Sequence, residues 1–211
     1  MVDAARHAQD EPTLVIREVG VGSLRNRSLG WYGMMTLIVT EACLFGYLLF
    51  SYYYTALHEG VGWFFEIPSL RLAAPNTILL IASSFVVWFA ERRVKAGGRW
   101  APAAALLVAV LMCAVFMYVQ WIEWVDKPFR YDTNSYGSLY FVVTGFHMAH
   151  VLAGLLVLLA LAVWTGAGLF DGRRNAHVAI GAIYWHFVDV VWLFVFFTFY
   201  VTPYLGIGGG A

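Results

Sequence analysis

The strongest constraint on the fold is a series of five apolar runs, each long enough to cross a lipid bilayer as a helix. The predicted spans cover about 31–57, 76–96, 100–121, 138–165 and 179–201. A hydrocarbon core about 30 Å thick needs roughly 20 apolar residues, because each helical residue adds about 1.5 Å. Only 12% of the residues are charged, whereas soluble domains carry about 25%. These features predict an all-α integral membrane bundle of five transmembrane helices.

Basic residues gather at one end of this predicted bundle. Ten of the 13 Lys and Arg residues fall in the N-terminal segment and in the loops after the second and fourth runs. Because cytoplasmic segments carry an excess of Lys and Arg, the pattern predicts a cytoplasmic N-terminus and an external C-terminus. We expect a polar cytoplasmic tail over residues 1–29, a membrane domain over 30–203 and a Gly-rich tail over 204–211. The connections are short, so helices adjacent in sequence are expected to be antiparallel neighbours.

The last run carries two polar side chains, His186 and Asp189, in the middle of its length. A helix advances about 100° per residue, so these two lie on nearly the same face. Trp185 and Trp192 extend that face as a stripe of rings around the acid. An ionisable group in hydrocarbon costs about 2.5–3.5 kcal/mol on insertion scales. Asp189 is therefore expected to face neighbouring helices rather than lipid.

Glu41 lies about ten residues into the first run, near the middle of the membrane. Such an acid is a candidate for a proton relay or ion path, or else a protonated acid that bonds a neighbouring helix. The residues alone leave both interpretations open. No acid or base at a similar depth is expected to complete a proton wire with Glu41, which weakens the transport interpretation.

Two histidines, His147 and His150, stand three residues apart on the fourth run. A metal site would need three or four converging ligands, and His186 could join the pair. A haem held by two imidazoles would need His186 together with one of them. Interhelical hydrogen bonding is the preferred interpretation for all three histidines. Close helix contact is expected at a neighbouring stripe of small residues, Gly145, Ala149 and Ala153.

Glu123 lies near the end of the third run, where its position alone favours an ordinary hydrated acid at the membrane interface. The two cysteines, Cys43 and Cys113, lie in apolar runs without CxxC or Cys/His spacing. Small buried side chains are therefore favoured over a disulfide or a metal site. The formal net charge of +0 at pH 7 gives no indication of a nucleic-acid partner.

Five segments, in this order and spacing, resemble subunit III of the haem–copper oxidases, the cytochrome c and quinol oxidases. They are TEACLFGYLLFSYYYTALH at 40–58, NTILLIASS at 76–84, QWIEW at 120–124, YGSLYFVVTGFHMAHVLAG at 136–154 and YWHFVDVVWLF at 184–194. The resemblance extends over about residues 30–203. It is to the short bacterial form, whose five helices match the last five of the longer form.

The resemblance implies a non-catalytic core subunit of a respiratory oxidase that reduces O2 to water and pumps protons. It implies no cofactor in this chain, haem and copper in partner subunits, and bound phospholipid. The implied partners are subunit I by direct packing, subunit II and other oxidase subunits, in a bacterial plasma membrane. Glu41 matches the family's membrane-buried carboxylate, which implies support of proton uptake. The family's other recurrent polar positions, with an implied structural role, are matched by Glu123, His147, His150, His186 and Asp189.

Several alternatives compete with this interpretation. Within the same superfamily, the chain could be a quinol oxidase subunit III or a homologue associated with nitric oxide reductase. From other classes, it could be a free-standing proton or ion carrier built around Glu41 and Asp189. It could also be a b-type cytochrome that uses His186 with His147 or His150.

Overall fold

The computed structural model describes residues 29–59, 63, 68–170, 172 and 174–205, and these form five long helices without a strand. The helices are α1 (Leu29–Glu59), α2 (Leu70–Lys95), α3 (Trp100–Val125), α4 (Ser135–Gly166) and α5 (Ala176–Phe196). A π-helical turn (Phe197–Val201) and a 3-10 turn (Thr202–Leu205) continue α5. Residues 1–28 and 206–211, which make up most of the two expected tails, lie outside the described residues.

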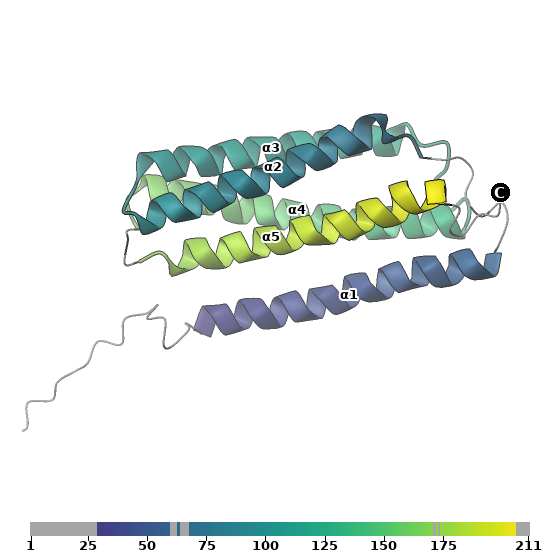
Figure 1. The fold of residues 1–211 in the computed structure, drawn as a ribbon, viewed down its shortest axis with the longest axis horizontal. Coiled ribbons are helices and arrows are strands. Elements are labelled where there is room, and N and C mark those ends of the chain that lie inside the picture. Colours follow the sequence, from purple (N-terminus) through teal and green to yellow (C-terminus); the bar gives the residue numbers. More distant parts are fainter. Residues whose placement is uncertain (1–28, 60–62, 64–67, 171, 173, 206–211) are drawn as a thin grey trace, which may run out of the picture.

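All five helices are long and apolar enough to cross a membrane. The prediction of an all-α bundle of five membrane-spanning helices is therefore confirmed. The helices lie side by side and alternate in direction (Figure 1). Consequently α1, α3 and α5 end at the same side of the bundle at which α2 and α4 begin.

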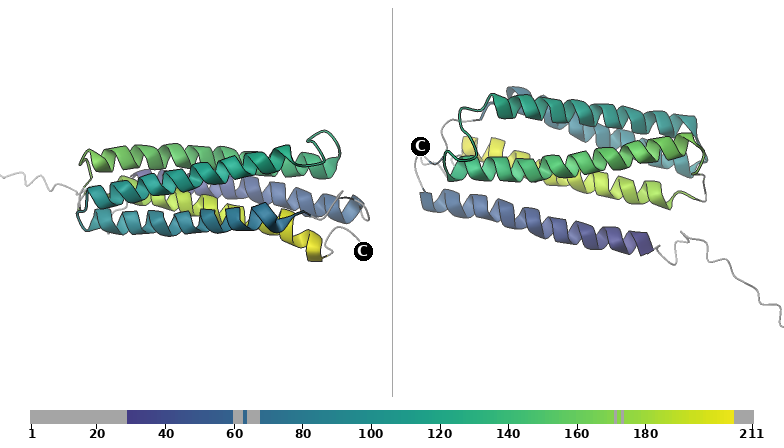
Figure 2. Two further views of the ribbon diagram at one scale, coloured as in Figure 1. Left: turned by 90° about the horizontal axis from the view of Figure 1, so that it is seen from above. Right: turned by 180° about the vertical axis from the view of Figure 1, so that it is seen from behind.

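The helices α2 to α5 pack together, and α1 lies along one side of them (Figures 1 and 2). Neighbours in sequence are neighbours in space from α2 onward. For α1 this expectation is wrong, because α1 packs beside α4 and α5 rather than beside α2. The chain between Glu59 and Leu70 is long enough to pass from one side of the bundle to the other, since each extended residue spans about 3.3–3.6 Å.

A small residue on α4 sets the close approach of α4 and α5, but it is not one of the expected stripe. A Cβ atom built on Gly154 would lie 2.8 Å from ring carbon Cε3 of Trp185, which is fully buried. By contrast, Ala149 and Ala153 are exposed, and a Cβ on Gly145 would meet nothing within 4 Å. The predicted close-contact stripe was therefore wrong. Gly154 takes its place because the indole ring of Trp185 needs that space.

The first helix is held to the bundle mainly by its second half. Its buried residues are Phe45, Tyr52 and Ala56, and no earlier residue of α1 is buried. Cys43 is exposed on this helix, so burial of both cysteines was a wrong expectation, although Cys113 of α3 is buried. An apolar helix with so little buried surface is expected to face lipid or another subunit.

Candidate functional site

The polar face of α5 is turned toward α2. Asp189 is buried, and its Oδ2 accepts a hydrogen bond from the Ser84 hydroxyl. Ser84 Oγ also lies 2.9 Å from Nδ1 of His186. A serine hydroxyl has a single proton, so while Ser84 donates to Asp189, His186 must donate its Nδ1–H to Ser84. The three side chains therefore form one interhelical hydrogen-bonded chain.

The two tryptophans of the same stripe also bond α2. Trp185 Nε1 donates to the Ser83 hydroxyl at 3.1 Å, and Trp192 Nε1 donates to the Thr77 hydroxyl at 3.0 Å. Buried indole N–H groups usually find such a partner. The interface between α2 and α5 is thus a ladder of hydrogen bonds between small hydroxyls on one helix and larger polar side chains on the other.

His147 has a different environment from the other two histidines. It is fully buried, and its ring lies 4.8 Å from that of Trp192 at an interplanar angle of 30°. Phe45 and Phe116 approach it edge-on at centroid distances of 6.5 and 6.2 Å. Neither ring nitrogen has a hydrogen-bond partner among the described residues. Interhelical hydrogen bonding was therefore a wrong expectation for His147, which is held by packing against aromatic rings.

Glu41 contacts a titratable side chain, His150, that the sequence did not indicate as its partner. Its Oε2 lies 3.0 Å from Nε2 of His150, across the interface between α1 and α4. The other ring nitrogen of His150 lies 2.7 Å from the carbonyl oxygen of Phe146 and must donate to it, because a carbonyl only accepts. A single proton is therefore shared between Glu41 and His150, on either the carboxylate or Nε2. The side chains are 26% and 16% exposed, respectively.

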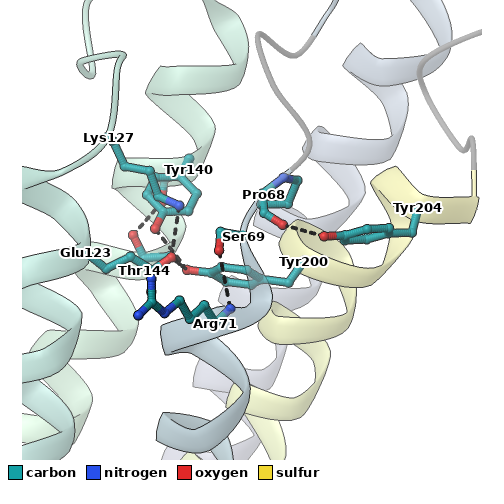
Figure 3. Close-up of polar contacts among 9 residues, drawn as sticks. All are labelled: Pro68, Ser69, Arg71, Glu123, Lys127, Tyr140, Thr144, Tyr200 and Tyr204. Carbon is teal, nitrogen blue, oxygen red and sulfur yellow. Dashed lines mark hydrogen bonds and ion pairs between the residues drawn. The ribbon is translucent and has the colours of Figure 1, made fainter.

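Glu123 is not the hydrated acid that its position suggested. Its side chain is 7% exposed, and its Oε1 accepts hydrogen bonds from Lys127 Nζ at 2.9 Å and from the Tyr200 hydroxyl at 2.6 Å (Figure 3). The Tyr140 hydroxyl lies 3.0 Å from that of Tyr200. Lys127 also lies over the rings of Tyr140 and Tyr200, at 5.1 and 5.4 Å. The acid is thus enclosed by a cation and two phenols.

The π-helical turn after α5 directs these phenol contacts. It buries three consecutive side chains, Thr198, Phe199 and Tyr200. Thr198 Oγ1 lies 3.1 Å from the hydroxyl of Tyr53 on α1, while Tyr200 reaches Glu123 on α3. The turn thus contacts both α1 and α3, and π-helical turns occur frequently at functional sites.

Metal or haem binding finds little support in this geometry. Over the described ranges 29–59, 63, 68–170, 172 and 174–205, no group of three or more His, Cys, Asp or Glu side chains could hold a metal ion. His186 bonds α2 and His150 bonds α1, so these two rings are directed to different neighbours. His147 is enclosed by aromatic side chains.

Comparison with known proteins identifies the family. The family described as cytochrome c oxidase subunit III matches residues 26–204. The chain belongs to this family. The predicted resemblance of its five segments to subunit III of the haem–copper oxidases is thereby confirmed.

Similar proteins come from distant organisms. Cytochrome c oxidase subunit 3 of Marchantia polymorpha is 32% identical over 177 residues, which cover 80% of this chain and 67% of the relative. The corresponding protein of Petromyzon marinus is 34% identical over 182 residues, 80% of this chain and 68% of the relative. That of Thermostichus vulcanus is 31% identical over 174 residues, 80% of this chain and 85% of the relative.

The sequence analysis did not identify the side chains that bond the candidate polar residues. The hydroxyls of Thr77, Ser83 and Ser84 lie in an apolar run with successive spacings of six residues and one residue, and all three bond side chains of α5. Glu123 and Lys127 are four residues apart, a spacing that brings opposite charges together on a helix. Both signals were present in the sequence. No local signal pointed to His150 as the partner of Glu41, because the two are far apart in the chain.

Proposed function

We propose that this chain is the non-catalytic subunit III of a haem–copper terminal oxidase that reduces O2 to water and pumps protons. Membership of the cytochrome c oxidase subunit III family carries the proposal. Haem and copper then belong to partner subunits, and this chain packs against subunit I and contacts subunit II. The relatives are named cytochrome c oxidases, which favours cytochrome c over quinol as the electron donor. Phospholipid fills the lipid-facing surface of the assembly.

Glu41 is proposed to support proton uptake together with His150. An acid and a base that share a proton at 3.0 Å can accept or release it with little rearrangement. Both side chains are partly exposed on an otherwise apolar face of α1 and α4, so a neighbouring subunit or a water chain can reach them. Asp189 and Glu123 are enclosed within the bundle, and their proposed role is structural, like that of His147 and His186.

The proposed orientation has the N-terminus in the cytoplasm and the C-terminus outside, in a bacterial plasma membrane. Five described basic residues stand at the bundle end where α2 and α4 finish: Arg92, Arg93, Lys95, Arg99 and Arg174. Three stand at the opposite end: Arg71, Lys127 and Arg130. The positive-inside bias supports this orientation. Arg92 also lies 4.2 Å above the exposed ring of Trp88, a pairing suited to the headgroup region.

The deciding experiment is isolation of the tagged chain from its native membrane. We expect haem–copper subunits to co-purify and to give the absorption spectrum of a terminal oxidase. Isolation of the chain with no haem–copper subunit would overturn the proposal. Proton movement by the chain alone in liposomes would instead support the free-standing carrier.

The proton-uptake role is tested with the variants Glu41→Gln and His150→Gln in the assembled oxidase. We expect assembly and the initial rate to be preserved, and activity during sustained turnover to fall faster than in the parent. Because one proton serves both residues, the double variant should be no worse than either single variant. Glu59→Gln, at the far end of the same helix, is the control and should behave like the parent. Unchanged sustained turnover in Glu41→Gln would remove the role.

A further inference from the structure

The first helix is attached to the bundle unequally along its length. Its C-terminal half has three buried residues, Phe45, Tyr52 and Ala56, whereas no residue of its N-terminal half, 29–44, is buried. In the most apolar stretch of α1 only 6% of the residues are buried, compared with 33–56% in the other four spans. The N-terminal half of α1 therefore has little packing to hold it against α4 and α5.

Hydrogen bonds between α1 and the rest of the bundle differ in kind between the two halves. In the C-terminal half, the hydroxyls of Tyr52 and Tyr53 meet threonine hydroxyls in the turns after α5. In the N-terminal half, the carboxyl group of Glu41 reaches across to α4, where its Oε2 lies 3.0 Å from Nε2 of His150. The C-terminal half is thus held by neutral groups, and the N-terminal half by a pair that can change its charge.

One proton decides whether the contact between Glu41 and His150 is attractive. Nδ1 of His150 donates to the carbonyl oxygen of Phe146, so Nε2 is the nitrogen that faces the carboxyl group. When a proton lies on either Nε2 or the carboxyl group, one group donates and the other accepts. Without this proton, a carboxylate oxygen faces a nitrogen lone pair, and both atoms can only accept. Loss of the shared proton therefore replaces a hydrogen bond with a repulsive contact.

The other titratable groups around this pair do not replace the shared proton. Tyr184 of α5 donates its hydroxyl to the backbone carbonyl oxygen of His150 at 3.3 Å. His147, on the same helix as His150, is enclosed by aromatic rings, and Cys43 of α1 is exposed. The ion pairs of the described residues give Glu41 the partner His150 and no Lys or Arg. The attraction between the two helices at this depth therefore depends on the protonation of the pair itself.

We propose that Glu41 and His150 form a proton-dependent latch between α1 and α4. While the pair shares a proton, the latch holds the N-terminal half of α1 against the bundle. When the proton leaves to water, which can reach the partly exposed side chains, this half of α1 separates from α4. The contacts of Tyr52 and Tyr53 keep the C-terminal half in place. The latch uses the pair proposed for proton uptake, but it follows from the hydrogen-bond geometry and does not depend on that role.

The test is amide hydrogen exchange in the complex that co-purifies with the tagged chain, followed by mass spectrometry of its peptides. Exchange is compared at about pH 5.5 and about pH 9, on either side of the range in which free imidazole groups change charge. Each rate is divided by the intrinsic rate at the same pH, which leaves the protection by structure. We expect protection of residues 29–44 to fall about three- to tenfold at the higher pH, the change for one interhelical hydrogen bond. Protection of α3 should stay constant.

Two variants at position 41 separate the proton from the packing. Glu41→Gln keeps an N–H donor for Nε2 of His150 at every pH, so protection of residues 29–44 should be high and independent of pH. Glu41→Leu keeps a side chain of similar size but makes no hydrogen bond, so protection should be low at both pH values. Glu59→Gln, an exposed position at the C-terminal end of the same helix, is the matched control and should keep the pH dependence of the parent.

Three results would overturn the latch. They are protection of residues 29–44 in the parent that does not change with pH, equal protection in Glu41→Leu and the parent at the lower pH, and a loss of protection at the higher pH that is shared equally by all five helices. The latch and the proton-uptake role can fail separately. A pH-dependent parent together with normal sustained turnover in Glu41→Gln would remove only the uptake role, and impaired turnover with pH-independent protection in the parent would remove only the latch.

Discussion

Glu41 and Glu123 are both acids within membrane-spanning helices, yet their surroundings are opposite. Glu123 has a cation and a phenol on one oxygen and a side chain that is 7% exposed. The Glu41 carboxyl group bonds the imidazole of His150, and the Glu41 side chain is 26% exposed. The difference shows that the depth of an acid in a span does not by itself indicate its role. The number of its partners, and whether they can change their charge, separates an acid that holds the fold from one able to exchange protons.

The same contrast applies to the helices that carry these acids. The interface of α2 with α5 is closed by hydrogen bonds that Trp185 and Trp192 donate to small hydroxyls, and by one that Asp189 accepts from a serine hydroxyl. The first helix is hydrogen-bonded through Tyr53 to the π-helical turn and through Tyr52 to the 3-10 turn after α5, and through Glu41 to α4. Substitutions in the closed region should therefore destabilise the bundle, and equivalent substitutions around α1 should not.

We expect the greatest loss of stability when the side chain of Glu123 is removed. In Glu123→Ala, Lys127 loses its ion-pair partner at a site where its side chain is 12% exposed, and Tyr200 loses its acceptor. Breaking such a buried pair costs about 3–5 kcal/mol. In Glu41→Ala, His150 keeps its bond to the Phe146 carbonyl oxygen, so we expect a loss of about 1 kcal/mol or less. Thermal denaturation of the purified protein in detergent measures both.

This pair of variants tests directly whether enclosure determines the contribution of each acid. Equal midpoints of denaturation for Glu41→Ala and Glu123→Ala would show that enclosure of the acid does not determine its contribution. A double variant, Glu123→Ala with Lys127→Met, should recover part of the loss because the stranded charge is removed.

A second pair of variants tests the close packing of α4 against α5. Leucine at position 154 would force its side chain into the buried Trp185 ring, whereas leucine at position 145 would enter open space on the same helix. Overpacking a core costs about 1–3 kcal/mol. We therefore expect Gly154→Leu to lower the denaturation midpoint clearly and Gly145→Leu to leave it unchanged. A larger loss in Gly145→Leu would show that a partner subunit covers this face.

Sequence patterns predicted the elements of this fold better than their arrangement. Span length and apolar content determine that five helices cross the membrane, because that requirement is local to each helix. Which helices pack together depends on surfaces that only the folded bundle brings into contact. Two examples are the packing of α1 beside α4 and α5 rather than α2, and the close helix contact at Gly154 rather than at Gly145.

For the polar residues, too, burial could be predicted from the sequence, but hydrogen-bond partners could not. The cost of a charge in hydrocarbon correctly directed Asp189 toward the bundle interior. Sequence could not show that Ser84 would be its partner, or that His150 would meet Glu41, since each pair is joined only by packing between helices. The prediction of a hydrogen bond for His147 was wrong because its neighbours are aromatic rings, which come together only when the helices pack.

A single hydroxyl at the attachment of α1 should have the weakest influence on stability. In Tyr53→Phe, the hydroxyl that meets Thr198 at 3.1 Å is lost while the ring remains. Interhelical hydrogen bonds of this type contribute about 0.6 kcal/mol on average. The global denaturation midpoint should hardly change, but amide hydrogen exchange in α1 should accelerate, because α1 has few other anchors to the bundle. Tyr54→Phe, on the exposed face of the same helix, is the control and should leave exchange unchanged. Acceleration in α2 or α3 as strong as that in α1 would contradict the view that α1 is the separately attached element.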